Sequence, residues 1–107
     1  MARLLQVIPA EGFHLYGAMV QKEIDLSRKK KGTFYRSGPK ARDRAKWAHS
    51  KYSGRINLVR ADGGVVTAEI RSKSSRDDEW QLLQAFIGWL DRHFDGNLEA
   101  INIQFRG

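Results

Sequence analysis

No cysteine occurs in this sequence of 107 residues, and its apolar runs are short. The absence of cysteine excludes disulfides, thiolate catalysis and cysteine-ligated metals, and it suits a reducing compartment. The longest apolar run, residues 85–90, already includes a glycine, so no membrane span is expected. The apolar start before Pro9 is too short for a signal peptide. We therefore expect a cytoplasmic protein.

Recognised catalytic motifs are missing as well. His14, His49 and His93 stand alone, without a partner at the spacing of a metal-binding helix. No serine lies in a nucleophile elbow, and no glycine-rich phosphate loop is present. We expect no catalytic residue, no metal and no cofactor.

Positive charge is what the sequence has in abundance, and it is concentrated in one segment. The net charge is +7, and between Arg28 and Arg60 twelve lysines or arginines face a single acid, Asp43. A polyanion that binds such a segment relieves its self-repulsion and releases condensed counterions. The sequence therefore predicts a small basic protein that binds DNA or RNA, mainly through phosphates.

The candidate binding residues lie at 28–55 and are Arg28, Lys29, Lys30, Lys31, Arg36, Lys40, Arg42, Arg44, Lys46, Trp47, Lys51 and Arg55. A helix over 39–53 would place Trp47 on a basic face. There the indole would either stack on an unpaired base or cover the core beneath lysine stems.

The C-terminal half has the clearest secondary-structure signals. Alternating residues predict strands at 55–60 and 65–71, joined by the three-residue loop 62–64. That loop pairs Ile56 with Ile70 and places apolar residues on one face. A helix over 78–94 and a strand over 98–105 follow, the latter with Ile101, Ile103 and Phe105 inward. We expect one α+β domain over residues 1–107, with a mainly antiparallel sheet of three to five strands packed on this long C-terminal amphipathic helix.

The helix over 78–94 carries two apolar sets. A central stripe of Leu83, Ile87, Leu90 and Phe94 is the expected core face. The second set, Leu82, Phe86 and Trp89, widens the apolar arc to roughly half of the helix circumference. Either the N-terminal segment covers this second set, or it forms a homodimer interface. An interaction or dimerisation module is therefore the alternative functional prediction.

The N-terminal half gives weaker signals. A strand over 3–8 ends at Pro9, and the following residues fit a helix over 10–26, although 22–36 also fits a hairpin. With the helix, the order of elements is ferredoxin-like, and residues 28–54 form a basic insertion.

One enzyme family shares part of this pattern. The stretch Gly54 to Lys73, GRINLVRADGGVVTAEIRSK, resembles the hairpin of the restriction-endonuclease-like nuclease superfamily. In that family an Asp on one strand and Glu-x-Lys on the next bind a divalent metal. Glu69 matches the Glu, whereas Asn57 stands in place of the Asp and Arg71 in place of the Lys. The resemblance therefore implies a degenerate or divergent nuclease as a second alternative.

Overall fold

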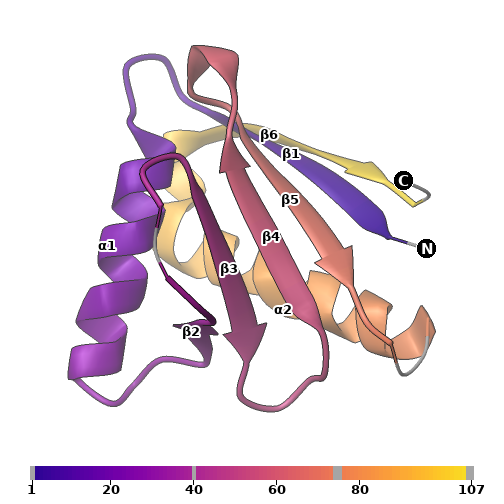
Figure 1. Cartoon of the computed structure of the whole chain (residues 1–107). Helices are drawn as coiled ribbons and strands as arrows, with labels where there is room; N and C mark the ends of the chain where they lie inside the picture. Colours follow the sequence, from indigo (N-terminus) through magenta and orange to yellow (C-terminus); the bar gives the residue numbers. More distant parts are fainter. Residues whose placement is uncertain (1, 40, 74–75, 106–107) are drawn as a thin grey trace.

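A six-stranded antiparallel sheet organises the chain, and the strands lie in the order β2-β3-β4-β5-β1-β6 (Figure 1). The structure is a computed structural model that describes residues 2–39, 41–73 and 76–105. The elements are β1 (Arg3–Pro9), α1 (Leu15–Arg28), β2 (Phe34–Arg36), β3 (Arg44–His49), β4 (Arg55–Arg60), β5 (Val66–Arg71), α2 (Arg76–Phe94) and β6 (Leu98–Gln104). The predicted α+β class and antiparallel sheet are confirmed, but the expected three to five strands were too few.

The predicted register of the β4–β5 hairpin is confirmed. Ile56 lies opposite Ile70 and Leu58 opposite Ala68, and a turn at Asp62–Gly64 joins the strands. Gly63 adopts a φ of 75°, which glycine reaches without steric cost. The alternation of apolar and polar residues therefore predicted correctly that three residues form the turn between β4 and β5.

The order β1, α1, β4, β5, α2, β6 is that of a ferredoxin-like fold, in which β5 lies between β1 and β4. β2 and β3 belong to the segment that we expected as an insertion, and they extend the sheet beyond β4. The basic segment is therefore part of the sheet.

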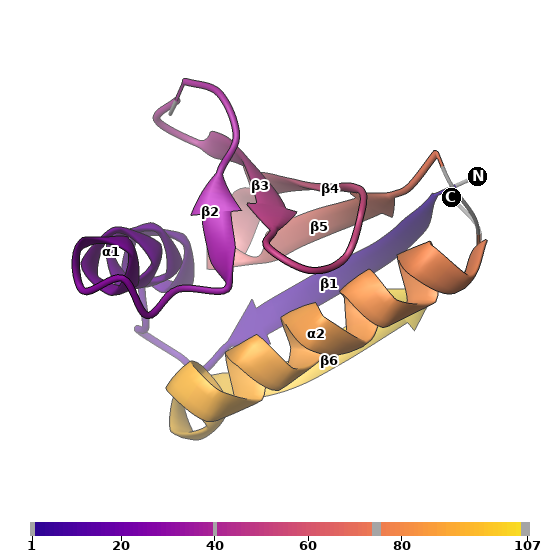
Figure 2. The ribbon, with the colours of Figure 1, turned by 90° about the horizontal axis from the view of Figure 1, so that it is seen from below.

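Helix α2 lies across one face of the sheet, and α1 flanks β2 (Figures 1 and 2). We call the side that carries α2 the covered face and the opposite side the open face. Apolar side chains from five strands and both helices are buried in one core on the covered face. On the open face, β3 and β4 present the polar side chains of Arg44, Lys46, Arg55 and Asn57, and Val59 is an exposed apolar residue among them.

The helix expected over 39–53 was wrong, because the described residues of this range form β3 and its flanking loops. Ala45 and Trp47 are buried, whereas Arg44 and Lys46 are exposed, which is the alternation of a strand. Trp47 packs in the core, with ring centroids 6.0 Å from Phe34 and 5.1 Å from Trp89. Tertiary packing of this indole outweighs local helix propensity.

Both apolar sets of α2 pack in the core, and the predicted core face is confirmed, since Leu83 and Leu90 are fully buried. Leu82, Phe86 and Trp89 are at most 3% exposed, so they lie at the centre of the covered face. Phe34 contacts Phe86 and Trp89 at centroid distances of 6.0 and 6.3 Å. A homodimer interface at this second set is therefore wrong, since the chain itself covers these side chains.

The remaining helix and strands are close to expectation. The predicted N-terminal strand and helix are present, with the helix at Leu15–Arg28, so the competing hairpin over 22–36 was wrong. In β6, Ile101 is half-buried, but Ile103 is exposed, and so is Phe105 just beyond the strand, contrary to their inward assignment. Among the described residues, no helix is long and apolar enough to cross a bilayer.

Candidate nucleic-acid interface

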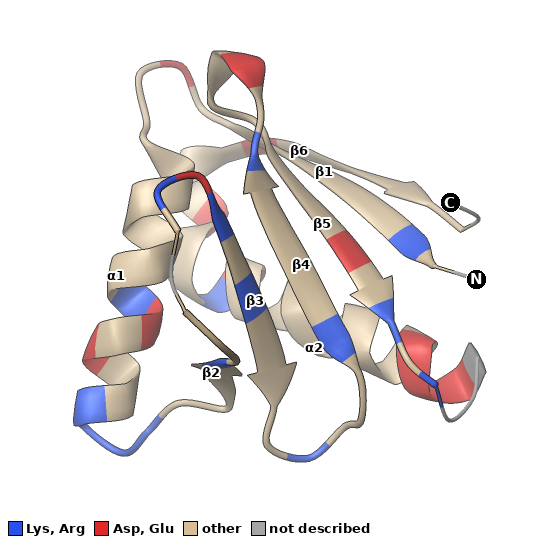
Figure 3. Cartoon of the chain, in the orientation of Figure 1, with Lys and Arg blue, Asp and Glu red and all other residues tan. Residues whose placement is uncertain are grey.

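Four cationic side chains gather on the open face. Lys46 comes from β3, Arg55 from β4 and Arg71 from β5, and Lys73 follows β5 (Figure 3). Arg55 lies directly opposite Arg71 in the sheet register, and Lys46 lies opposite Asn57. All four cations line one hollow with a volume of about 630 Å³, which we call the basic groove. Adjacent strands thus assemble a charge cluster from residues up to 27 positions apart.

Glu69 is the acid at the centre of this surface. Its Oε1 accepts hydrogen bonds from Arg71 Nε (2.8 Å) and Asn57 Nδ2 (3.0 Å), and its Oε2 accepts one from Arg71 Nη2 (3.2 Å). The hydrogen bond from Arg71, followed by that from Asn57, holds the pKa of Glu69 below its usual value, although burial opposes the shift. Glu69 is therefore ionised at neutral pH and partly offsets the charge of Arg71.

The other three cations of the groove keep their charge available. Among the described residues, no carboxylate forms an ion pair with Lys46, Arg55 or Lys73. Arg55 instead donates from Nη1 to the backbone oxygen of Gly54 at 2.9 Å. Like charges within one hollow raise the local positive potential, which attracts an anion.

The wall of the groove is tied to the helix beneath it. Gly54 has a φ of 117°, and a Cβ placed there would lie 2.4 Å from the backbone oxygen of Arg71. Ser53 Oγ lies 3.2 Å from Ser72 Oγ and donates to Asp78 Oδ2 at 3.1 Å. Glycine thus permits the close approach that brings the loop before β4 against the end of β5.

The predicted binding residues do not all meet in one place. Arg28 and Lys29–Lys31 lie at the C-terminal end of α1, and Lys51 lies in the β3–β4 connection. Arg36, Arg42 and Arg44 lie at or between the ends of β2 and β3, and Lys40 falls outside the described residues. Of the predicted set, Lys46 and Arg55 line the basic groove.

Two cations of the groove, Arg71 and Lys73, were missed as binding residues. The alternation of the hairpin had placed Arg71 on the polar face, and that signal identifies it. Lys46 was predicted only as one of many cations in the basic segment. Its position opposite Asn57 could not be predicted, because it requires β3 to be a strand. The count of charges along the sequence therefore identifies the basic segment but not the four cations that line the basic groove.

Of the two alternatives for Trp47, the place in the core is confirmed and stacking on a base is wrong, because the side chain is fully buried. Tyr35 is the large aromatic residue of the basic segment that is exposed, at 48%. It lines a second, shallow hollow of about 310 Å³ together with Arg28 and Arg36. A tyrosine flanked by arginines has the chemistry for stacking on a base.

The three residues of the nuclease resemblance do meet in the structure. Asn57 and Glu69 lie opposite one another and are hydrogen-bonded, and Arg71 is the next residue on the same face. Cations and an amide surround the carboxylate, and among the described residues no three His, Asp or Glu side chains form a metal-binding group. A divalent cation needs several oxygen ligands, so this set does not fit one.

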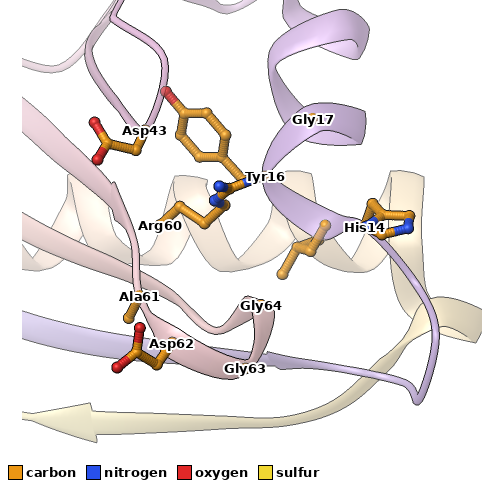
Figure 4. A pocket seen from close by; sticks show the side chains of 10 residues that line it. His14, Tyr16, Gly17, Asp43, Arg60, Ala61, Asp62, Gly63 and Gly64 are labelled. Carbon is orange, nitrogen blue, oxygen red and sulfur yellow. The ribbon is translucent and has the colours of Figure 1, made fainter.

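A separate hollow of about 440 Å³ lies between the start of α1 and the β4–β5 turn (Figure 4). Asp43 lies beside the ring of Tyr16, whose hydroxyl donates to the backbone oxygen of Ala41 at 3.3 Å. Burial and then Asp43 raise the pKa of Tyr16, while Arg60 opposes the shift. The mixed charges and the protonated, hydrogen-bonded hydroxyl make this a weaker anion site than the basic groove.

No family model, curated protein or solved structure matches the chain. The geometry of the chain itself therefore carries the functional argument.

Proposed function

We propose that this protein binds nucleic acid through the open face of its sheet, without catalysis. The convergence of Lys46, Arg55, Arg71 and Lys73 on one groove carries the proposal. Strands in a sheet are about 4.8 Å apart, so cations on adjacent strands can follow successive phosphates of a backbone. DNA or RNA is the partner class, because it presents such phosphates in a row.

The chemistry of the groove favours phosphates over bases. Among the residues that the structure describes, its lining holds lysine, arginine, serine and asparagine side chains and no aromatic ring. Lysine and arginine contacts to phosphates supply affinity without reading sequence. Tyr35, outside the groove, is the residue placed to add stacking on an unpaired base.

The test is fluorescence anisotropy of labelled single-stranded and duplex DNA and RNA at several salt concentrations. With four to five phosphates neutralised, the slope of log K against log salt should be about −4 for duplex DNA. Lys46→Ala and Arg55→Ala should each flatten that slope by about one unit. Tyr35→Ala should weaken single strands more than duplexes.

Arg92→Ala provides a charge-matched control, because Arg92 is exposed on α2, away from the open face. It should leave the slope unchanged. Heparin serves as an acidic competitor that lacks bases and regular phosphates. A slope near zero, or equal effects of Arg55→Ala and Arg92→Ala, would contradict the proposal.

A further inference from the structure

The two edges of the sheet differ in how well they are protected from further pairing. β2 forms one edge with three residues and ends at Arg36, whereas β6 forms the other with seven residues. β6 contains no lysine, arginine or proline, and among the described residues no strand pairs with its outer side. Short length, lysine and proline are the usual devices that prevent edge pairing. β6 therefore presents an open hydrogen-bonding edge.

Apolar side chains accumulate beside this edge. Trp80, Ile103 and Phe105 are 37%, 36% and 56% exposed, and the rings of Trp80 and Phe105 lie 5.9 Å apart. A groove of about 510 Å³ runs between α2 and β6, and Ile87 and Ile101 are among its lining residues. An apolar surface of this kind beside an unpaired strand marks an interaction site.

We propose that the occupant is a second copy of this chain, which pairs antiparallel with β6 across a two-fold axis at Asn102. The regular part of the strand is Ala100–Gln104, since the β1–β6 register shifts between Ile8 and Pro9. In this register Ile101 lies opposite the partner's Ile103, and Asn102 lies opposite the partner's Asn102. The match is self-complementary, as a two-fold interface requires.

Charge favours this antiparallel arrangement. One end of the groove is acidic, with Asp91, Asp95 and Glu99 in its lining. At the other end the Arg3 guanidinium lies 5.2 Å from the ring centre of Trp80 and 5.5 Å from that of Phe105, with Glu79 3.7 Å away. Antiparallel pairing brings Glu99 toward the partner's Phe105 and the partner's Arg3. Glu99 thereby gains a cationic neighbour, the partner's Arg3, which already contacts Glu79 of its own copy, and the same contact forms twice.

The first test measures assembly by sedimentation equilibrium. Wild type should be dimeric at tens of micromolar, and Ile103→Lys should raise the dimer dissociation constant about 100-fold, because it places a charge in the apolar seam. Val59→Lys is the matched control, as Val59 is 42% exposed on β4 and distant from the β6 edge in the sheet order. It should leave the dimer intact. A monomeric wild type at millimolar concentration, or a dimer that survives Ile103→Lys, would overturn the proposal.

The second test checks the register. The chain has no cysteine, so Asn102→Cys introduces a single thiol. Directly opposite Cα atoms in antiparallel strands are about 4.5 to 5.5 Å apart, within disulfide range. Mild oxidation should therefore produce a covalent dimer at low protein concentration. Gln6→Cys, on β1 opposite Asn102, should cross-link far more slowly. Equal rates for the two variants would refute the two-fold at Asn102.

Discussion

The covered and open faces of the sheet are built from the same strands but have opposite chemistry. On β3, Trp47 is buried against Phe34 and Trp89, while its neighbour Lys46 lines the basic groove. On β4, Ile56 is buried and Arg55 is exposed. Alternation along a strand lets one segment stabilise the fold on one side and carry charge on the other. Substitutions on the two faces should therefore affect different measurements.

The largest effect is expected on the covered face. Trp47→Ala should lower the free energy of unfolding by about 3 to 5 kcal/mol, because it leaves a cavity among aromatic rings. Urea denaturation followed by circular dichroism measures the loss. Tyr35→Ala, at a half-exposed aromatic on the neighbouring strand, should cost less than about 1 kcal/mol. Similar losses for the two variants would contradict the burial of Trp47.

Gly54 lies beside the basic groove and also next to the core residue Leu82, and its substitution should cause the next largest loss of stability. Gly54→Ala forces a side chain into a φ of 117° and against the backbone oxygen of Arg71. A destabilisation of about 1 to 3 kcal/mol is expected. Gly17→Ala is the control, since open space surrounds that helical position and alanine should stabilise α1. An unchanged melting temperature for Gly54→Ala would show that the loop relaxes.

On the covered face, acidification should lower the stability of the protein by protonating His49. His49 Nδ1 accepts hydrogen bonds from the backbone nitrogens of Lys51 (2.9 Å) and Tyr52 (3.3 Å). Burial, and then Lys51, lower the pKa of His49. The unfolded chain therefore binds the proton first, and stability falls as pH drops below about 6.5.

Thermal denaturation between pH 7 and pH 5 should reveal this loss, and His49→Asn should reduce it. His93 contributes in the same direction, because burial and nearby Lys22 and Arg92 lower its pKa. Ring titration by NMR separates the two residues. A His49 that titrates above the value of free histidine would invert the prediction.

The smallest stability effect is expected at Glu69 on the open face. Its lowered pKa means that its stabilising contribution is present above the pKa of the unfolded chain and is lost as pH falls through the folded value. Glu69→Gln should cost less than about 1 kcal/mol at neutral pH and should flatten the acid limb of the stability curve. The same variant releases Arg71, so the salt dependence of nucleic-acid binding should steepen. Weaker salt dependence would show that Glu69 assists binding.

The sequence predicted most where a single local signal was decisive. Pairing Leu58 with Ala68 required only that apolar residues share one face, and the structure has that register. The helix prediction over 39–53 was wrong because Lys40, Arg44, Trp47 and Lys51 have the spacing of an amphipathic helix. The aromatic residues that bury Trp47, however, come from distant segments. The periodicity of a segment cannot predict which distant residues it will contact.

The candidate site was predictable in charge but not in position. Lys46 reaches the groove only because β3 pairs with β4, whereas the alternation of the β4–β5 hairpin already places Arg71 on the polar face beside Arg55. The sequence also left open whether Leu82, Phe86 and Trp89 are covered or form an interface, because their cover, Phe34 and Trp47, comes from the basic segment itself. Contacts between distant segments decided where Lys46 and this second apolar set of α2 lie.

The adjacency of Lys46 and Trp47 on β3 has a thermodynamic consequence. The cation can occupy the groove only when the indole beside it is in the core, so binding and folding of this strand are linked. A polyanion that binds the folded groove raises the midpoint of thermal unfolding, and each tenfold excess of free ligand over its dissociation constant adds about 1.4 kcal/mol. High salt, by removing that ligand, should return the protein to its intrinsic stability. The midpoint of thermal unfolding therefore measures how much of the groove is occupied by the polyanion.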